Sequence, residues 1–374
     1  MKKAPVAMDL FAGCGGLSRG LQLAGFDVRA AVEIDKTARE AYAANHPNTV
    51  LFEDVLDVTS KELRAACKGE PLALLAGCAP CQGFCSLTAK NKKEDPRNRL
   101  LLRMAEIIAE LKPQAVMMEN VPGLTQRGSA IFEEFISTLE KLDYPARNAW
   151  RILQMADYGI PQSRRRLVML VGRGFAIPFL EPTHARQPTP ESTLKRWLTL
   201  REAIGKRSLP KTLKQARADG GPSKHSWHVV RDLQPQVAER LAAAIPGKTW
   251  LELDEKFRPD CHKGSYEGFT NVYGRMSWEQ TPVTITAGCT TPSKGRFGHP
   301  DKNRTTISVL ESALIQTFPD DYNFVTQQMD AVCKMIGNAV PPEFARVAGD
   351  RILQTLKSRK RQLVSRKTDY PLPH

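Results

Sequence analysis

Residues 77–86 read Gly-Cys-Ala-Pro-Cys-Gln-Gly-Phe-Cys-Ser and directly follow an apolar run, Leu72 to Ala76, that is short enough to be a buried strand. Open α/β sheets bind ligands where their strands end in loops, which is where this pattern puts the thiol of Cys81. Taken alone, these residues leave three interpretations open. Cys78, Cys81 and Cys85 could be small core residues. Cys81 could instead be a reactive thiol, or the Cys78-x-x-Cys81 pair could bind a metal, although no second ligand pair follows at zinc spacing.

The first 175 residues alternate short apolar runs with helical patterns, which is typical of a mainly parallel sheet connected by helices. The apolar runs predict strands at 6–10, 28–32, 50–55, 72–76, 115–118 and 167–171. Apolar side chains at helical spacing predict helices at 17–24, 37–45, 100–111 and 131–142.

The chain of 374 residues exceeds the roughly 250–300 residues at which single cores stop growing, so we expect two domains. Between residue 175 and about residue 304, prolines, threonines and basic residues dominate, with one convincing helix at 235–244 and a short strand at 282–286. Helical patterning returns at 308–316 and 342–356. We therefore expect an α/β domain formed by residues 1–175 and 325–374, and a smaller, irregular domain with its hinge at residues 176–324.

The composition narrows the class of protein. No apolar run approaches the ~20 residues of a membrane span, and the N-terminus leads into a strand instead of a signal peptide, so we expect a cytoplasmic protein without a membrane partner. The net charge is +14, and two segments are strongly basic: Lys195 to Lys224 has nine basic and two acidic residues, and Arg351 to Lys367 has seven basic and none acidic. Positive charge concentrated in this way fits a nucleic acid partner. The alternatives are a solvated basic face and, for the second segment, a disordered tail.

The loop after the first predicted strand has the composition of a cofactor site. Asp9-Leu-Phe-Ala-Gly-Cys-Gly-Gly16 precedes a helix, and glycines there let the backbone approach a ligand at the helix N-terminus. Glu33 ends the second strand, where a carboxylate can accept hydrogen bonds from ribose hydroxyls, and Asp54 ends the third, where it can accept from an adenine amino group. The glycine spacing is not that of a dinucleotide loop, and no basic residue in the loop could meet a pyrophosphate. These features favour S-adenosylmethionine over a dinucleotide, with a turn that binds no ligand as the alternative.

Three further clusters each have an ordinary structural explanation when taken singly. Residues 119–122, Glu-Asn-Val-Pro, leave a strand at the same edge as the thiol, although the glutamate could be a plain ion-pair partner. Residues 162–166, Gln-Ser-Arg-Arg-Arg, alternate so that Arg164 and Arg166 point the same way, but they could form a solvated edge. Residues 337–342, Gly-Asn-Ala-Val-Pro-Pro, precede the last predicted helix and could be a plain turn.

In this order the clusters resemble the DNA cytosine-5 methyltransferase family. Phe11-Ala-Gly-Cys-Gly-Gly16 is similar to the family's cofactor loop, and Pro80-Cys81-Gln82 is similar to its nucleophile loop. The family's later motifs resemble, in the same order, the segments 119–121, 162–166, 304–319 and 337–341. The resemblance extends from residue 8 to about residue 350, and only residues 175–303 match weakly. Cys85, where the family usually has Ser, and Met335, where it often has Gln, depart from the pattern away from the reacting groups.

The resemblance implies a Rossmann-like, S-adenosylmethionine-dependent methyltransferase sheet, with a target-recognition domain at 176–324 and no metal. Cys81 would add to C6 of a cytosine flipped out of double-stranded DNA. Glu119 would stabilise charge on the ring, Arg164 would hold the base O2 or the adjacent phosphate, and Arg166 would support Cys81 or Glu119. The implied cofactor contacts are Phe11, Gly13, Gly15, Gly16, Leu17, Glu33, Ile34, Asp54, Val55, Pro80, Leu100, Asn338 and Val340. The implied DNA contacts are Gln82, Ser86, Lys90, Lys92, Lys93, Arg97 and Arg164.

Three other functions compete with this one. The same chemistry could act on tRNA, but a recognition region of about 125 residues that carries a basic segment favours duplex DNA. A catalytically silent nucleic-acid-binding protein would have no need of the nucleophile, the glutamate and both arginines together. The third function, a dinucleotide oxidoreductase, is supported by the cofactor loop alone. The resemblance also predicts a monomer that is either an orphan methylase or the modification enzyme of a restriction–modification system, with a cognate restriction endonuclease as partner.

Overall fold

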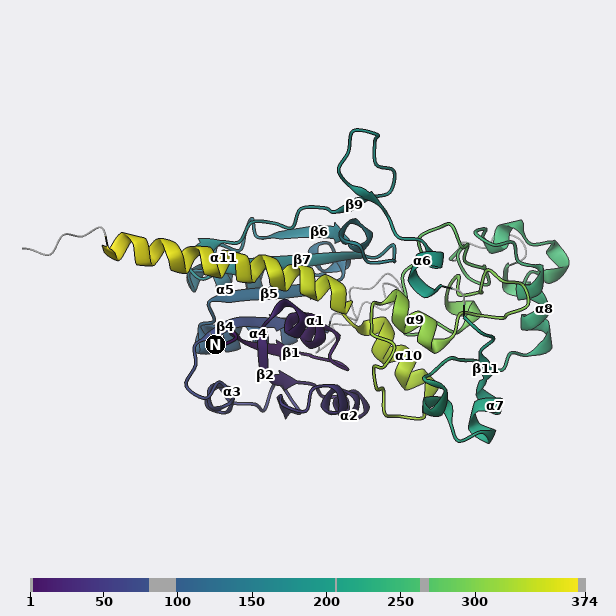
Figure 1. Ribbon diagram of the computed structural model, residues 1–374, viewed down its shortest axis with the longest axis horizontal. Helices are drawn as coiled ribbons and strands as arrows, with labels where there is room; N and C mark the ends of the chain where they lie inside the picture. Colours follow the sequence, from purple (N-terminus) through teal and green to yellow (C-terminus); the bar gives the residue numbers. More distant parts are fainter. Residues whose placement is uncertain (1–2, 81–98, 206, 263–268, 369–374) are drawn as a thin grey trace, which may run out of the picture.

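The computed structural model describes residues 3–80, 99–205, 207–262 and 269–368. In this part of the chain a central sheet has the strand order β3-β2-β1-β4-β5-β7-β6, with β8 beside β7 (Figure 1). Strands β1 to β5 are parallel, whereas β7 runs antiparallel to β5, β6 and β8. The predicted α/β class is confirmed, and the carboxyl ends of the parallel strands share one edge. The strands are β1 Val6–Leu10, β2 Asp27–Val32, β3 Val50–Phe52, β4 Leu72–Gly77, β5 Ala115–Asn120, β6 Trp150–Gln154, β7 Arg165–Gly172 and β8 Phe175–Ala176.

Helices cover both faces of the sheet, which is why its strands are apolar on both sides. Side chains such as Met8 and Leu10 face one core layer, which also contains α3 (Ser60–Ala66), α4 (Leu100–Leu111) and α5 (Ser129–Lys141). The alternate side chains, such as Ala7, face the layer formed by α1 (Gly16–Ala24) and α11 (Pro342–Thr368). In Figure 1, α11 crosses the front of the sheet beside α1. Helix α2 (Lys36–Asn45) follows β2 and is capped by Asp35, which accepts from two backbone N–H groups.

A second, irregular lobe lies beyond the carboxyl edge of the sheet (Figure 1). It contains α6 (Leu200–Ile204), α7 (Leu213–Ala218), α8 (Pro235–Ala243) and the short strand pair β11–β12 (Lys211–Thr212, Val229–Val230). The pair β9–β10 (His184–Ala185, Lys195–Arg196) lies apart from them, beside residues 155–158 that follow β6. Part of this lobe has a small apolar cluster of its own, formed by Ala244, Trp250, Leu253 and Val272. Helices α9 (Val309–Ile315) and α10 (Met329–Asn338) lie between the lobe and the sheet.

Some local predictions are wrong. Residues 282–286 do not form a strand and make only an isolated bridge between Ser163 and Val283. Two alternatives that the sequence left open also do not hold: residues 337 and 338 end α10 and do not form a plain turn, and the basic segment Arg351 to Lys367 lies within α11 and is not a disordered tail. The irregular lobe has α6 and α7 in addition to the one predicted helix, and α3 and β6 were not predicted. Helices α3, α6 and α7 each start with a capping box, a sequence signal at residues 59–62, 199–202 and 212–215 that the apolar pattern did not include.

Candidate active site

The carboxylate of Glu119 lies near the end of β5, the strand between β4 and β7. Its side chain is only 3% exposed. The Nε atom of Arg166, on β7, lies 3.1 Å from Oε1, and the thiol of Cys78, directly after β4, donates to Oε2 at 2.9 Å. The structure therefore brings together the predicted acid and one of the two predicted arginines. Of the two residues that Arg166 was predicted to support, Cys81 and Glu119, it contacts Glu119.

The start of the nucleophile loop is tied to the strands beside it. The backbone N–H of Cys78 donates to the Leu10 carbonyl at 3.3 Å, and Asn120 Nδ2 donates to the Ala79 carbonyl at 3.1 Å. Asn120 belongs to the 119–122 motif, but the sequence predicted no role for it. Its buried side-chain amide holds the start of the nucleophile loop. Cys81 itself and the predicted DNA contacts Gln82, Ser86, Lys90, Lys92, Lys93 and Arg97 lie outside the described residues, and their roles stay predictions.

Arg164 makes backbone contacts that the sequence did not predict. Its guanidinium is buried, and it donates to the carbonyls of Ile285 at 3.0 Å and of Gly337 and Ala339 at 3.3 Å. Burial, followed by the nearby positive charge of Arg166, lowers the pKa of Arg164 to about 9, so it stays charged at neutral pH. The Nη atoms of Arg164 therefore clamp distant segments together, while its Nε has no hydrogen-bond partner among the described residues. The predicted contact of Arg164 with a base O2 or a phosphate stays a prediction.

Two glutamines extend this clamp. Gln162 accepts from the Ile285 N–H at 2.8 Å and donates to Gln316 Oε1 at 2.7 Å. Gln316 in turn donates to the carbonyls that end α10. The motifs at 162–166, 304–319 and 337–341 therefore meet in one buried polar cluster. Buried polar groups of this kind are costly unless they are paired, which explains why the motifs use glutamine and arginine here.

The predicted cofactor residues follow β1, β2 and β3, three adjacent strands of the same edge. Glu33 accepts from the backbone N–H groups of Gly13 and Asp35, both at 2.8 Å, and burial raises the pKa of Glu33. Asp54 Oδ1 accepts from the Leu56 N–H at 2.9 Å. Ile34, between the two acids in the chain, is 64% exposed and offers an apolar surface beside Glu33. The acids are thus fixed by backbone groups, and each carboxylate keeps lone pairs for a ligand.

The backbone of the cofactor loop has an unusual conformation. Phe11 has a φ of 61°, which is rare for a bulky residue and is a form of strain that clusters at ligand sites. Gly15 has a φ of 98°, and a Cβ there would lie 2.4 Å from His46 Nε2, so no other residue fits. Tyr322 donates its hydroxyl hydrogen to the Cys14 carbonyl, and His46 lies 3.2 Å from the same hydroxyl. The loop is therefore held from behind by α2 and by the segment that precedes α10.

Several other predicted cofactor contacts are core residues. The side chains of Leu17, Val55 and Val340 are buried, so only their backbone atoms could reach a ligand. A Cβ on Gly16 would lie 2.6 Å from the Val340 carbonyl oxygen, which shows how closely the loop approaches the start of α11. Leu100 and Pro80 are partly buried, and Asn338 is exposed. The predicted cofactor contacts of these residues therefore stay predictions.

The basic segment from Lys195 to Lys224 is partly neutralised within the chain. Five of its cations pair with acids: Arg196 with Glu202 at 3.6 Å, Arg201 with Glu279 at 2.6 Å, Arg207 with Asp320 at 3.1 Å, and Lys211 and Lys224 with Asp219. Within the described part of the chain, three exposed cations have no ion-pair partner: Lys195, Lys214 and Arg217. Only this second set is free to meet phosphates without breaking an ion pair.

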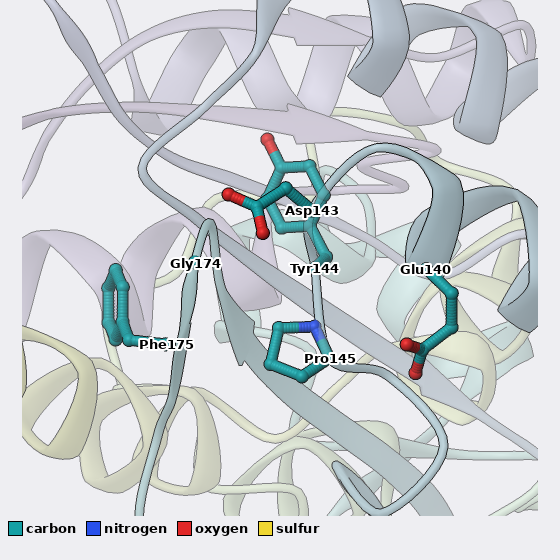
Figure 2. Close-up of a pocket in the computed structure, with 6 residues that line it drawn as sticks. All are labelled: Glu140, Asp143, Tyr144, Pro145, Gly174 and Phe175. Atoms are coloured by element: carbon teal, nitrogen blue, oxygen red, sulfur yellow. The ribbon is translucent and has the colours of Figure 1, made fainter.

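A hollow of about 240 Å³ lies away from this chemistry (Figure 2). It is bounded by the turn between β7 and β8, and the end of β7 pairs with the start of β5. It therefore lies at the edge of the sheet opposite Glu119 and Glu33, and neither its volume nor its two acids suit an adenosyl cofactor. The hollow is lined by Glu140, Asp143, Tyr144, Pro145, Gly174 and Phe175.

The comparison with known families agrees with this geometry. The model of the C-5 cytosine-specific DNA methylase family matches residues 6–354. The chain belongs to this family. The methylase is 36% identical to the type II methylase M.HgiDII of Herpetosiphon aurantiacus, over 95% of this chain and 97% of that protein. It is 31% identical to the type II methyltransferase M.XorII of Xanthomonas oryzae, over 95% of this chain and 86% of that protein.

Solved structures support the fold. A DNA modification methyltransferase encoded within an E. coli prophage superposes with a TM-score of 0.69 at 22% identity, covering 95% of this chain and all of that one. The family match shows that this chain is a DNA cytosine-5 methyltransferase, which decides against a dinucleotide oxidoreductase and favours DNA over tRNA. None of the described helices is long and apolar enough to cross a bilayer.

Proposed function

We propose that this methylase transfers a methyl group from S-adenosylmethionine to C5 of a cytosine flipped out of a specific duplex DNA sequence, through a covalent bond between Cys81 and C6. The observation that carries the proposal is the buried carboxylate of Glu119, which lies between the anchored start of the nucleophile loop and Arg166. Among the described residues Oε1 has no hydrogen-bond partner, because the contact with Arg166 lacks hydrogen-bond alignment. Such an atom is costly to leave unpaired and is available to a base.

The residues divide the reaction into two easier steps. The Cys81 thiolate adds to C6, and the electron pair of the C5–C6 double bond moves to C5. Glu119, sharing a proton with N3, stabilises the charge that develops on the ring, and Arg166 fixes the carboxylate. The bound cofactor supplies an electrophilic methyl group to C5. A base then removes the C5 proton, the double bond re-forms and the thiolate leaves, so that one methyl group replaces one proton.

The residues at the other half of the edge fit an adenosine. Glu33 and Asp54 can accept from ribose hydroxyls and from the adenine amino group, and Ile34 offers an apolar surface for the ring. A Cβ placed on Gly13 would meet no atom within 4 Å, so the loop is open on the side that faces away from the protein. These residues would hold the cofactor next to β4 and β5, at the point of the sheet where strand order reverses.

We assign sequence recognition to residues 176–324. The apolar cluster around Trp250 supports a separately packed part of this region, although Leu200 and Trp227 pack in a core shared with α10 and the cofactor loop. The free cations of its basic segment suit DNA phosphates. The type II names of the relatives support a role as the modification enzyme of a restriction–modification system. A cognate endonuclease as partner and a monomer as the active form are part of the same proposal.

Trapping on DNA that contains 5-fluorocytosine tests the proposal. Fluorine at C5 cannot leave as a proton does, so wild type should accumulate a covalent adduct that resists denaturation. Cys81→Ser should form none while binding S-adenosylmethionine in calorimetry as wild type does. Bisulfite sequencing of DNA from expressing cells then identifies the target site. An adduct that persists in Cys81→Ser would reject the nucleophile, and a wild type that forms no adduct would reject the covalent route.

A further inference from the structure

The strand register places Cys78 beside Glu119. Gly77 pairs with Met118 in the parallel β4–β5 ladder, so the next residues along each strand, Cys78 and Glu119, are neighbours with side chains on the same face. In the antiparallel β5–β7 ladder Glu119 pairs with Val168, which places Arg166 on that face as well. The central carboxylate is thus flanked by a thiol from one neighbouring strand and by a guanidinium from the other.

The two flanking groups contact different oxygens of the carboxylate. Cys78 Sγ donates to Oε2 at 2.9 Å, while Arg166 Nε lies 3.1 Å from Oε1. The terminal torsion of a glutamate is broad, so a single partner would leave the carboxylate free to rotate. One partner on each oxygen fixes its plane.

We propose that Cys78 is a positioning residue, whose thiol holds the Glu119 carboxylate in the orientation that presents Oε1 to the flipped cytosine. This inference rests on the proposed role of Glu119. Cys78 does not touch the reacting atoms in this scheme and acts only through the glutamate. The groups that surround the carboxylate from the neighbouring strands are Cys78, Arg164 and Arg166, and of these the arginine at 164 is committed to backbone carbonyls.

A packing role is the competing explanation, because cysteine often behaves as a small hydrophobic residue. Cys78 is partly buried and packs against the core layer of α1 and α11. Alanine would keep most of this packing and remove the donor, whereas serine would keep a donor of similar size. The pair Cys78→Ala and Cys78→Ser therefore separates the two explanations.

The experiment measures single-turnover methylation of DNA that carries the target site, with S-adenosylmethionine at saturation. Cys78→Ala should lower the rate roughly five- to tenfold, because part of the general acid catalysis by Glu119 depends on the alignment of its carboxylate. Cofactor affinity should stay unchanged. Cys78→Ser should recover to within about twofold of wild type, since a hydroxyl also donates. Cys67→Ala, a cysteine exchange in the core between α3 and β2, is the matched control and should leave the rate unchanged.

A double-mutant cycle with Glu119→Gln tests whether the effect passes through the glutamate. If it does, Cys78→Ala should cause less than about a twofold further loss in the Glu119→Gln background. A Cys78→Ala rate equal to wild type would leave the thiol with packing alone, and an undiminished loss in the Glu119→Gln background would assign Cys78 a role apart from the acid. Equal losses in the alanine and serine variants would also overturn the inference. A wild type that methylates no cytosine would instead reject the proposed function on which the inference depends.

Discussion

Replacing each arginine of the pair 164 and 166 by alanine should have different effects, mainly on stability for Arg164 and mainly on the methylation rate for Arg166. Arg164 donates four hydrogen bonds to three buried carbonyls, at 3.0 to 3.3 Å. In Arg164→Ala these carbonyls lose their donor, and each unpaired carbonyl destabilises the folded state by about 1–3 kcal/mol. Part of this loss is offset, because the variant no longer has to desolvate a guanidinium on folding. We expect the free energy of unfolding to fall by about 3–5 kcal/mol, the usual result of breaking a buried charged network from one side.

Arg166→Ala should behave in the opposite way. Its side chain is partly exposed and makes one ion pair, with Glu119. We expect a smaller loss of unfolding free energy than in Arg164→Ala, because Arg166 is partly exposed and Cys78 still donates to the buried carboxylate. The single-turnover rate should fall about 10²–10³-fold, the scale for losing one preorganised electrostatic group.

Urea unfolding followed by tryptophan fluorescence, together with single-turnover methylation, measures both quantities. Arg164→Lys is the matched control, because it keeps the charge but cannot reach three carbonyls at once, so it should also lose stability. If Arg164→Ala unfolds like wild type but loses DNA binding or catalysis, the clamp is wrong and the arginine contacts the substrate.

Three further predictions concern the cofactor site, the buried acid and the basic segment. Glu33→Ala should weaken S-adenosylmethionine binding in calorimetry by roughly 1–3 kcal/mol, through lost charge-assisted hydrogen bonds and a looser Gly13 loop. Burial raises the pKa of Asp9 from 3.8 to about 7, so the folded state binds more protons than the unfolded state between these values and stability falls as pH rises. Asp9→Asn should remove this loss, gaining up to about 4 kcal/mol relative to wild type between pH 4 and pH 8 in urea unfolding. Neutralising the three free cations of the basic segment should reduce the slope of log affinity against log salt by up to about 2.7 on cognate and random DNA alike; they are Lys195, Lys214 and Arg217.

Each of these has a clear contrary result. Unchanged calorimetric affinity would remove Glu33 from the site, and parallel stability curves for Asp9→Asn and wild type would mean that Asp9 is ionised at no cost. For the salt slope the control is a glutamine variant at ion-paired cations, Arg201, Arg207 and Lys224, which should change the slope less. Equal slopes for wild type and the first variant would leave those cations with a role in solubility.

Local pattern was sufficient for the main elements of the sheet domain. The apolar runs and helical spacings predicted β1, β4 and α4 to within a residue, because each depends on side chains that alternate within a single segment. The carboxyl-edge position of Glu33 and Glu119 followed from the same pattern, since parallel strands end at a common edge. The helices α3, α6 and α7 also have a local sequence signal, which is the capping box at the start of each. They contain too few apolar residues to be predicted from apolar periodicity.

Only the tertiary structure assigned the two arginines. Arg164 and Arg166 are two residues apart on one face, so the sequence treats them alike, yet one meets the backbone of residues 285 and 337–339 and the other meets Glu119. Segments more than 120 residues distant make that difference, and no spacing within the motif encodes it. The contact of Cys78 with Glu119 likewise depends on the register of β4 against β5, because a shift of one residue would turn the thiol to the other face of the sheet.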